Sequence, residues 1–366
     1  MAVESSSLDE MEVLRGMLSV PKFNDFMSPD EFEAVMIPLM TDNTNNLRQN
    51  GRIENRFNSE GYLLPQCIAR FNDATYRYTY HVYRLGIRPD HVGHSLQELS
   101  SLSRSDDVQR RNMALNTLAN ILKIDRTGVY KRVIELPIGQ IFFVLKFNLD
   151  DDTPSILIAA IRALRNLVYF PIGEICLDKM ACSGMGIIQP VMSIDDAMED
   201  DDTLDDEQLA EINLTKCLIR TGTLERIRYI VNIVKPKMEI IVNCIEILIR
   251  LARDSKFVVD KILECEGLMS SLIRYFLPTM ESVGLDNSCP DWYYSPLPQM
   301  IKLLRVLSAR SRNIAANLLE EYDLLNTMIP YLDEGNFFQN DTNLQVECLR
   351  YWTLVLHYEF PMDAYR

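Results

Sequence analysis

A helical pattern of apolar residues recurs along most of this chain and restricts its fold more than any other property of the sequence. In the segment that begins at Ala160, the apolar residues Ile161, Leu164 and Val168 lie three and four positions apart, on one stripe of a helix. Such a helix buries its stripe only against neighbouring helices, so the segments are expected to stack. The pattern occurs in NMALNTLANIL from Asn112, AIRALRNLVYF from Ala160, NCIEILIRLAR from Asn243, IKLLRVLSARS from Ile301 and LRYWTLVLHYE from Leu349.

The spacing of these segments indicates the kind of repeat. Positions 112 and 160 lie 48 residues apart, as do positions 301 and 349, which is just above the ~40–47 residues of HEAT and armadillo units. Between the long segments lie two shorter amphipathic pieces, such as KFVVDKILECE and LMSSLIRYFLP, with Pro278 and Pro330 where second helices are expected to stop. A short helix, a second helix and a longer third helix form the armadillo plan. We therefore predict an all-α, armadillo/HEAT-like helical-repeat solenoid.

The predicted domain organisation is a poorly structured amino-terminal segment over residues 1–60 and a repeat domain over residues 61–366. The first segment is polar, with two short helices, the second of which starts at the capping signal Ser28-Pro29-Asp30-Glu31. Residues 41–60 are rich in Asn and turn formers and are predicted to be a mobile linker. A short strand is predicted where Tyr76, Tyr78 and Tyr80 alternate with other residues.

An acidic segment at residues 195–207 interrupts the repeat domain. Nine of its thirteen residues are Asp or Glu, and charges of one sign at this density repel each other and resist burial. A solvated loop is the expected structure. A calcium site fits poorly, because the alternating ligands and the central glycine of an EF-hand loop are missing. An electrostatic attraction for a basic partner is the remaining alternative.

Charge and targeting signals exclude several classes of protein. The formal net charge is -15, which disfavours non-specific binding to nucleic acid or to an anionic membrane surface. No secretory signal opens the sequence, and charged residues interrupt its apolar stretches. The eight cysteines form no Cys-x-x-Cys pair, so free thiols in a reducing compartment are expected. We expect no direct contact with nucleic acid and none with a membrane.

No motif in the sequence indicates catalysis, a metal site or a cofactor. His91 and His94 have a metal-like spacing, but they flank Gly93 in a stretch where a helix is not expected. The pair Gly184 and Gly186 is too short for a phosphate-binding loop. Because no nucleophile, base and orienting group occur together, we expect a protein that binds other proteins and is not an enzyme.

Arginines at matching positions of the third helices are the candidate binding residues. Each follows an apolar residue, and in an armadillo stack the third helices line the groove, so the guanidinium groups could contact the carboxylates of an extended acidic peptide. In the alternative interpretation they pair with acidic residues of the next repeat or reach solvent. An aromatic residue beside the last of them is a further candidate. The candidates are Arg165, Arg250, Arg305, Arg350 and Trp352.

Several ordered motifs also resemble the carboxy-terminal part of the RNA polymerase II-associated protein 1 family, over roughly residues 55 to 358. The most specific are the Ser-Leu-Gln-Glu-Leu stretch and the Arg-Asn-Ile-Ala-Ala stretch. The motifs are Arg56-Phe57-Asn58 with Gly61-Tyr62-Leu63-Leu64, Gly93-His94-Ser95-Leu96-Gln97-Glu98-Leu99, Phe147-Asn148-Leu149-Asp150-Asp151, Ala160-Ile161-Arg162-Ala163-Leu164-Arg165, Leu248-Ile249-Arg250-Leu251-Ala252-Arg253, Leu303-Leu304-Arg305-Val306-Leu307 and Arg312-Asn313-Ile314-Ala315-Ala316.

This resemblance implies a non-enzymatic factor of the nucleus and cytoplasm, without a cofactor, that acts in assembly or nuclear delivery of RNA polymerase II and in transcription. The implied partners are polymerase subunits, chaperone-type assembly factors and Mediator. Family members are longer, so we expect this chain to be truncated relative to them. The repeat pattern alone equally fits an armadillo-type adaptor for complexes unrelated to transcription.

Overall fold

The computed structural model describes ten stretches of the chain, which fall into two compact units. Unit 1 comprises residues 1–102 and 120–136, and unit 2 comprises residues 103–119 and 137–366. The boundary crosses helix α5 (Val108–Arg126), which contributes to both units. The described residues are 48–49, 52–53, 55–64, 78, 93–131, 133–182, 204–234, 237–277, 296–332 and 341–360.

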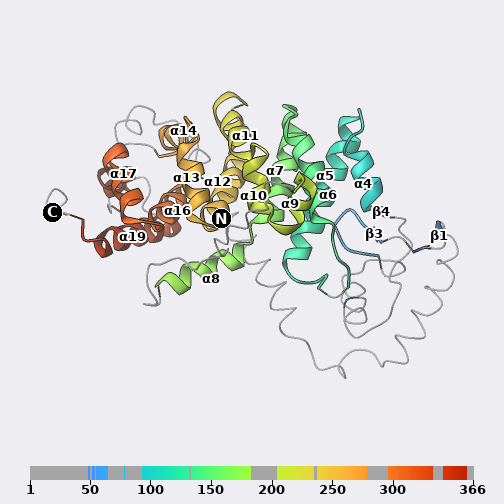
Figure 1. The fold of residues 1–366 in the computed structure, drawn as a ribbon, viewed down its shortest axis with the longest axis horizontal. Coiled ribbons are helices and arrows are strands. Elements are labelled where there is room, and N and C mark those ends of the chain that lie inside the picture. The colour runs from blue at the N-terminus through green and yellow to red at the C-terminus, as the bar shows by residue number, and fades with distance from the viewer. Residues whose placement is uncertain are drawn as a thin grey trace, which may run out of the picture. The chain divides into compact units, whose positions relative to one another are not determined.

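The described residues of unit 2 lie mainly in helices, which confirms the predicted all-α class. Figure 1 shows them following one another from cyan to red. The first part holds α6 (Ile138–Leu149), α7 (Pro154–Val168), α8 (Pro171–Cys182), α9 (Asp206–Ile212), α10 (Leu214–Arg220), α11 (Thr223–Tyr229), the π-helix η3 (Ile230–Val234) and α12 (Met238–Ala252).

The second part of unit 2 repeats a three-helix plan twice, as the sequence predicts for an armadillo-like array. The first set is α13 (Lys256–Glu264), α14 (Leu268–Phe276) and α16 (Leu297–Ser308). The second set is α17 (Arg312–Tyr322), α18 (Leu324–Leu332) and α19 (Thr342–His357). The two first helices start alike, because the side chains of Ser255 and Ser311 each accept a hydrogen bond from the backbone N–H three residues later.

The third helices α7, α12, α16 and α19 pack against one another in that order and form the core of unit 2. The predicted stripes face inward: Ile161 and Leu164 of α7 and Ile245 and Leu248 of α12 are fully buried. This stacking buries each apolar stripe against the stripe of the next repeat. The armadillo-like helical-repeat architecture follows from this row and from the three-helix plan.

The described residues of unit 1 include two small antiparallel pairs and the short helix that follows them, besides the end of α5. Strand β1 (Arg48–Gln49) pairs with β2 (Arg52–Ile53), and β3 (Arg56–Phe57) pairs with β4 (His94–Ser95), which leads into α4 (Leu96–Leu102). A capping box starts α4, since Glu98 N–H donates to Ser95 Oγ and Ser95 N–H donates to a Glu98 carboxylate oxygen, each at 3.2 Å. Arg56 Nη2 donates a hydrogen bond to Oε2 of the same Glu98 carboxylate at 2.8 Å. The Ser-Leu-Gln-Glu-Leu motif therefore begins a helix.

Three local predictions need correction. Residues 48–57, predicted as part of a mobile linker, contain the strands β1 to β3, because backbone pairing in extended segments does not require an apolar pattern. Tyr78 is helical and its hydroxyl donates to the carbonyl of Leu63 at 2.8 Å, so tertiary packing overrides the alternation of side chains there. Pro330 lies inside α18, whose last turn continues to Leu332.

Other predictions fall partly or wholly outside the described residues. The helix predicted at Ser28 lies outside them, as do Tyr76, Tyr80, Pro278, His91 and residues 195–203 of the acidic segment. The end of that segment is helical: Asp205 caps α9 by accepting a hydrogen bond from Gln208 N–H, and Asp206 and Glu207 occupy the first turn. Carboxylates are favourable there, because the amino-terminal end of a helix carries partial positive charge.

None of the described helices is singly long and apolar enough to cross a bilayer. Helices α7 and α8 meet the length and composition of a span together, but they are bent by 46° at the break between them.

Candidate protein-binding surface on the third helices

Polar side chains connect the first members of the third-helix row. Arg162 of α7 donates to Asn116 of α5 at 3.2 Å and to Glu239 of α12 at 3.0 Å. One turn further, Arg165 Nε donates to Glu246 Oε2 of α12 at 2.6 Å. These charge-assisted bonds cross between neighbouring repeats, so the arginines of α7 tie α7 to α12.

Arg165 has two further contacts that fix its position. Its Nη1 donates to Asn166 Oδ1 at 3.1 Å, and its guanidinium carbon lies 4.9 Å from the ring centroid of Tyr169. Tyr169 is buried at the end of α7, and this burial, together with the negative charges of Glu246 and Glu174, raises the pKa of its hydroxyl. Tyr169 therefore stays neutral and packs against Arg165.

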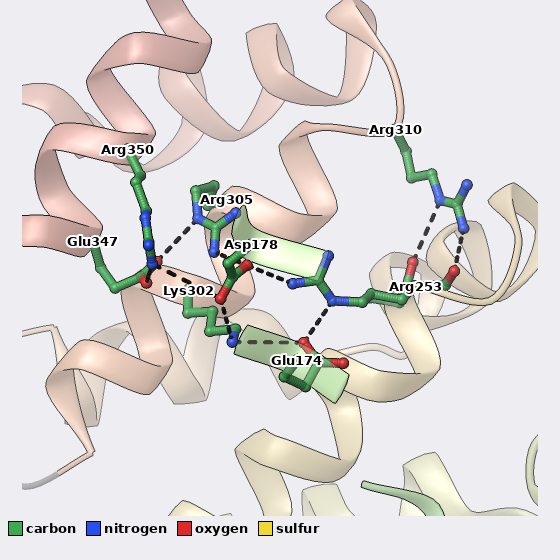
Figure 2. Close-up of polar contacts among 9 residues, drawn as sticks. Glu174, Asp178, Arg253, Lys302, Arg305, Arg310, Glu347 and Arg350 are labelled. Carbon is green, nitrogen blue, oxygen red and sulfur yellow. Dashed lines mark hydrogen bonds and ion pairs between the residues drawn. The ribbon is translucent and has the colours of Figure 1, made fainter. Parts of the chain in front are cut away.

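Helix α8 places two carboxylates against the middle of the row. After the 46° bend it carries Glu174 and Asp178, four residues apart and therefore on one face. Figure 2 shows both carboxylates pointing at Arg253, which follows α12. Arg253 Nε donates to Glu174 Oε2 at 2.6 Å and its Nη2 donates to Asp178 Oδ1 at 2.8 Å. All three side chains are at most 5% exposed.

Two cations of α16 approach the same carboxylates. Lys302 Nζ donates to Asp178 Oδ2 at 2.7 Å and lies 3.5 Å from Glu174 Oε2. Arg305 Nη2 donates to Asp178 Oδ1 at 2.7 Å, and its Nε donates to Glu347 Oε2 of α19 at 3.0 Å. Asp178 therefore receives hydrogen bonds from α16 and from the end of α12, and Arg305 extends the network to the next repeat (Figure 2).

The network ends on α19 and is supported at its other end by one more arginine. Arg350 Nη1 donates to Glu347 Oε1 at 2.5 Å and lies 3.8 Å from Asp178 Oδ2. Arg310 donates to the backbone carbonyl of Arg253 at 2.7 Å, which fixes the turn after α12. We call Arg253, Lys302, Arg305 and Arg350 the basic cluster, and Glu174 and Asp178 the α8 carboxylates.

The charges of this network reinforce one another. Burial alone would raise the pKa of Asp178, but the nearby charges of Arg305 and Lys302 outweigh it and hold that pKa well below its ordinary value. Burial would likewise lower the pKa of Arg305, and the charges of Glu347 and Asp178 outweigh it and raise that pKa. Both groups are therefore ionised at neutral pH.

The structure places the five candidate residues in different surroundings. Arg165 and Arg350 are partly exposed beside their carboxylate partners, and Arg305 is buried. The Nη1 atom of Arg250 is buried and has no hydrogen-bond acceptor among the described residues. Trp352 is half-buried. Binding by any of them stays a prediction.

The sequence patterns miss the acidic half of the network. Glu174 and Asp178 lie in a helix that shows no repeat signature, and Glu347 lies on an otherwise apolar face of α19. A four-residue spacing of carboxylates directly after Pro171 is the available signal, because proline favours the start of a helix. The arrangement can recognise charged groups of a partner. Among the described residues no group of three or more His, Cys, Asp or Glu could hold a metal ion.

Comparison with known proteins agrees with the resemblance inferred from the motifs. Residues 54–125 match the family described as RPAP1-like, C-terminal. RNA polymerase II-associated protein 1 of Rattus norvegicus is 31% identical over 345 residues, covering 86% of this chain and 24% of the relative. The Homo sapiens protein of that name is 31% identical over 337 residues, covering 84% of this chain and 24% of the relative. The resemblance is thereby confirmed, and the chain spans about a quarter of the length of these relatives.

Solved structures with a similar course of the chain include engineered proteins. A designed armadillo repeat protein has a TM-score of 0.43 and 13% sequence identity, covering 90% of this chain and 96% of its own. An engineered protein of known crystal structure has a TM-score of 0.46 and 13% identity, covering 81% of this chain and 88% of its own.

Proposed function

We propose that this chain, which resembles the carboxy-terminal part of RNA polymerase II-associated protein 1, is a non-enzymatic protein-binding scaffold associated with RNA polymerase II. The similarity to relatives of that name over 86% of the chain supports the association. In this proposal the scaffold acts in the assembly or nuclear delivery of the polymerase and in transcription. Its partners are polymerase subunits, chaperone-type assembly factors and Mediator, and it works in both nucleus and cytoplasm.

The observation that carries the binding function is the succession of basic side chains on consecutive third helices. The row holds Arg162 and Arg165 of α7, Arg250 of α12, Arg305 of α16 and Arg350 of α19. Charge-assisted hydrogen bonds from arginine to carboxylate are directional and often bidentate. An acidic segment of a partner that lies along the row meets such groups on successive repeats.

The members of the row have different parts in this proposal. The side chains of Arg162 and Arg350 are 41% and 28% exposed and contact the partner directly. Arg305 is buried and positions Glu347 and Asp178 for their neighbours. Trp352, half-buried on α19 two residues after Arg350, supplies an apolar contact at the end of the row.

Affinity purification of the whole chain from cell extract, followed by mass spectrometry, tests the proposal. The unmodified chain is compared with R162A/R350A, which leaves Glu347 paired with Arg305, and with the control R110A/R274A, which removes two exposed arginines of α5 and α14. We expect polymerase subunits or assembly chaperones with the unmodified chain and the control, and at least a ~5-fold lower yield with R162A/R350A, since loss of ~1 kcal/mol weakens binding about that much.

Two outcomes contradict the proposal in different ways. Capture of unrelated complexes without polymerase or its assembly factors would identify an adaptor that acts outside transcription. Equal capture by all three proteins, each shown to be folded by circular dichroism, would place the binding surface away from the third-helix row.

A further inference from the structure

The fully buried contacts of helix α8 with the third-helix row are made by its charged side chains. Of its residues 171–180, only Glu174 and Asp178 are buried. The apolar side chains of Ile175 and Met180 are each 52% exposed, and Cys176 is exposed as well. A helix that belongs to the core buries an apolar stripe, as the preceding helix α7 does. Helix α8 instead buries its two carboxylates, while Ile172 and Leu177 are only partly buried and Ile175 and Met180 are exposed.

The surface under α8 is built without it. The basic cluster comes from three successive repeats: Arg253 follows α12, Lys302 and Arg305 lie on α16, and Arg350 lies on α19. These elements belong to the row of third helices, which packs through its own apolar residues. The cluster meets two carboxylates separated by one helical turn, about 6 Å along the helix axis.

Unsatisfied polar atoms lie on the same helices. The Nη1 atom of Arg250 and the Oε1 atom of Gln299 are buried and have no hydrogen-bond partner among the described residues. Arg250 is three residues before Arg253, and Gln299 is three residues before Lys302, so each shares a helix face with a member of the basic cluster. They supply one donor and one acceptor that α8 does not use.

We infer that α8 is an intramolecular occupant of a binding site for an acidic helical segment of a partner protein, formed by Arg253, Lys302, Arg305 and Arg350. The partner segment carries two carboxylates four residues apart and takes the place of Glu174 and Asp178. This inference rests on the proposed function and assigns the binding surface and the class of partner segment. Release of α8 exposes no fully buried apolar side chain of its residues 171–180, and the entering carboxylates restore the ion pairs.

Competition by a synthetic peptide tests this exchange. The probe is a fluorescein-labelled peptide of residues 171–182 with serine in place of Cys176 and Cys182, added to the full chain and measured by fluorescence anisotropy. The receptor is the unmodified chain or E174Q/D178N, in which the tethered helix has lost its carboxylates. The matched control is E264Q/E320Q, which neutralises two exposed carboxylates of α13 and α17.

We expect the peptide to bind E174Q/D178N at least ~10-fold more tightly than it binds the unmodified chain or the control. A site that its own helix occupies ~90% of the time is free ~10% of the time, so its apparent affinity for the peptide is ~10-fold lower. A peptide with Gln and Asn in place of the two carboxylates is expected not to bind. Equal affinity of the acidic peptide for all three proteins overturns the inference.

Hydrogen exchange on the unmodified chain decides between the two roles of α8 even if the double variant does not fold. A displaceable helix opens without unfolding the row, so the amides of residues 174–182 are expected to exchange at least ~100-fold faster than those of α12 and α16. Exchange of α8 as slow as that of α12 identifies it as a structural element and overturns the inference.

The two proposals fail separately. Capture of polymerase components by the unmodified chain, with no peptide binding to E174Q/D178N, leaves the proposed function standing and removes the inference about α8. Peptide binding without capture of any polymerase component or assembly factor leaves the inference about α8 standing and removes the proposed function.

Discussion

Replacing Gly61 by alanine is expected to destabilise unit 1 strongly, because the backbone at this glycine lies against the backbone of a helix. Gly61 has φ of +90°, and a Cβ at this position would lie 2.5 Å from the carbonyl carbon of Asn120 and 2.5 Å from the nitrogen of Ile121 in α5. The left-handed backbone costs an L residue ~1–2 kcal/mol, and overpacking against an immobile backbone adds ~1–3 kcal/mol. We expect G61A to cost ~2–5 kcal/mol in local stability.

Gly128 is the matched control, because it lies in the same unit at φ of +80° and a Cβ there would have no neighbouring atom within 4 Å. G128A is expected to cost only the ~1–2 kcal/mol of placing an L residue in the left-handed backbone conformation. Native-state hydrogen exchange measures both variants through the Leu64 amide, which donates to the carbonyl of Arg56 at 2.8 Å. Equal losses of protection in the two variants would refute the close approach as the reason for glycine at position 61.

The remaining predictions concern unit 2. R305M removes the hydrogen bonds to Asp178 and Glu347 but leaves each carboxylate another cation. It is therefore expected to lower the free energy of unfolding by ~2–4 kcal/mol, near the range for breaking a buried ion pair, as measured by urea titration. No measurable loss would contradict this. Because the pKa of Asp178 is lowered in the folded state, its ion pairs stabilise the fold above the ordinary pKa of ~4 and this contribution is lost as pH falls below that value. The unfolding free energy of the unmodified chain should therefore fall more steeply below a pH of about 4 than that of R305M, and parallel profiles would argue against it. Burial raises the pKa of the Cys244 thiol to about 12, whereas Cys176 is exposed. A thiol reagent at a pH of about 8 should therefore modify Cys176 first and Cys244 only on unfolding, which peptide mass spectrometry measures. S311A removes the capping hydrogen bond of α17 and should cost ~0.5–2 kcal/mol by thermal unfolding, with S311T retaining most of it.

The sequence predicts well those features that depend on neighbouring residues. The stripe through Ile161 and Leu164 is a buried face because a 3.6-residue period places these side chains together whatever surrounds the helix. Ser311 caps α17 because its hydroxyl needs only an N–H three residues later. The order of a short, a second and a longer third helix follows from such local signals and from the need of each stripe for a neighbour.

Local signals are weaker where backbone or packing contacts are distant in sequence. Phe57 of β3 pairs with His94 of β4, so the partner that makes residues 56–57 a strand lies far outside the segment that was predicted to be a linker. Tyr78 is helical because its surroundings, and not its alternation with neighbours, determine its conformation. Pro330 ends no helix, since a proline near a carboxy-terminal turn removes only a bond to a preceding carbonyl and the turn can still form.

The order of residues is enough to specify the class of fold, the succession of helices and the matching positions of the arginines on the third helices. What each arginine faces depends on the packed chain: Arg165 meets Glu246 of the next helix, whereas Arg305 is buried against Asp178 of α8. The physical reason is that periodicity specifies which face of a helix a side chain occupies, but not what lies opposite that face. Opposite Arg305 lies α8, which reaches the row through the 46° bend after α7, and this bend is a property of the packed chain.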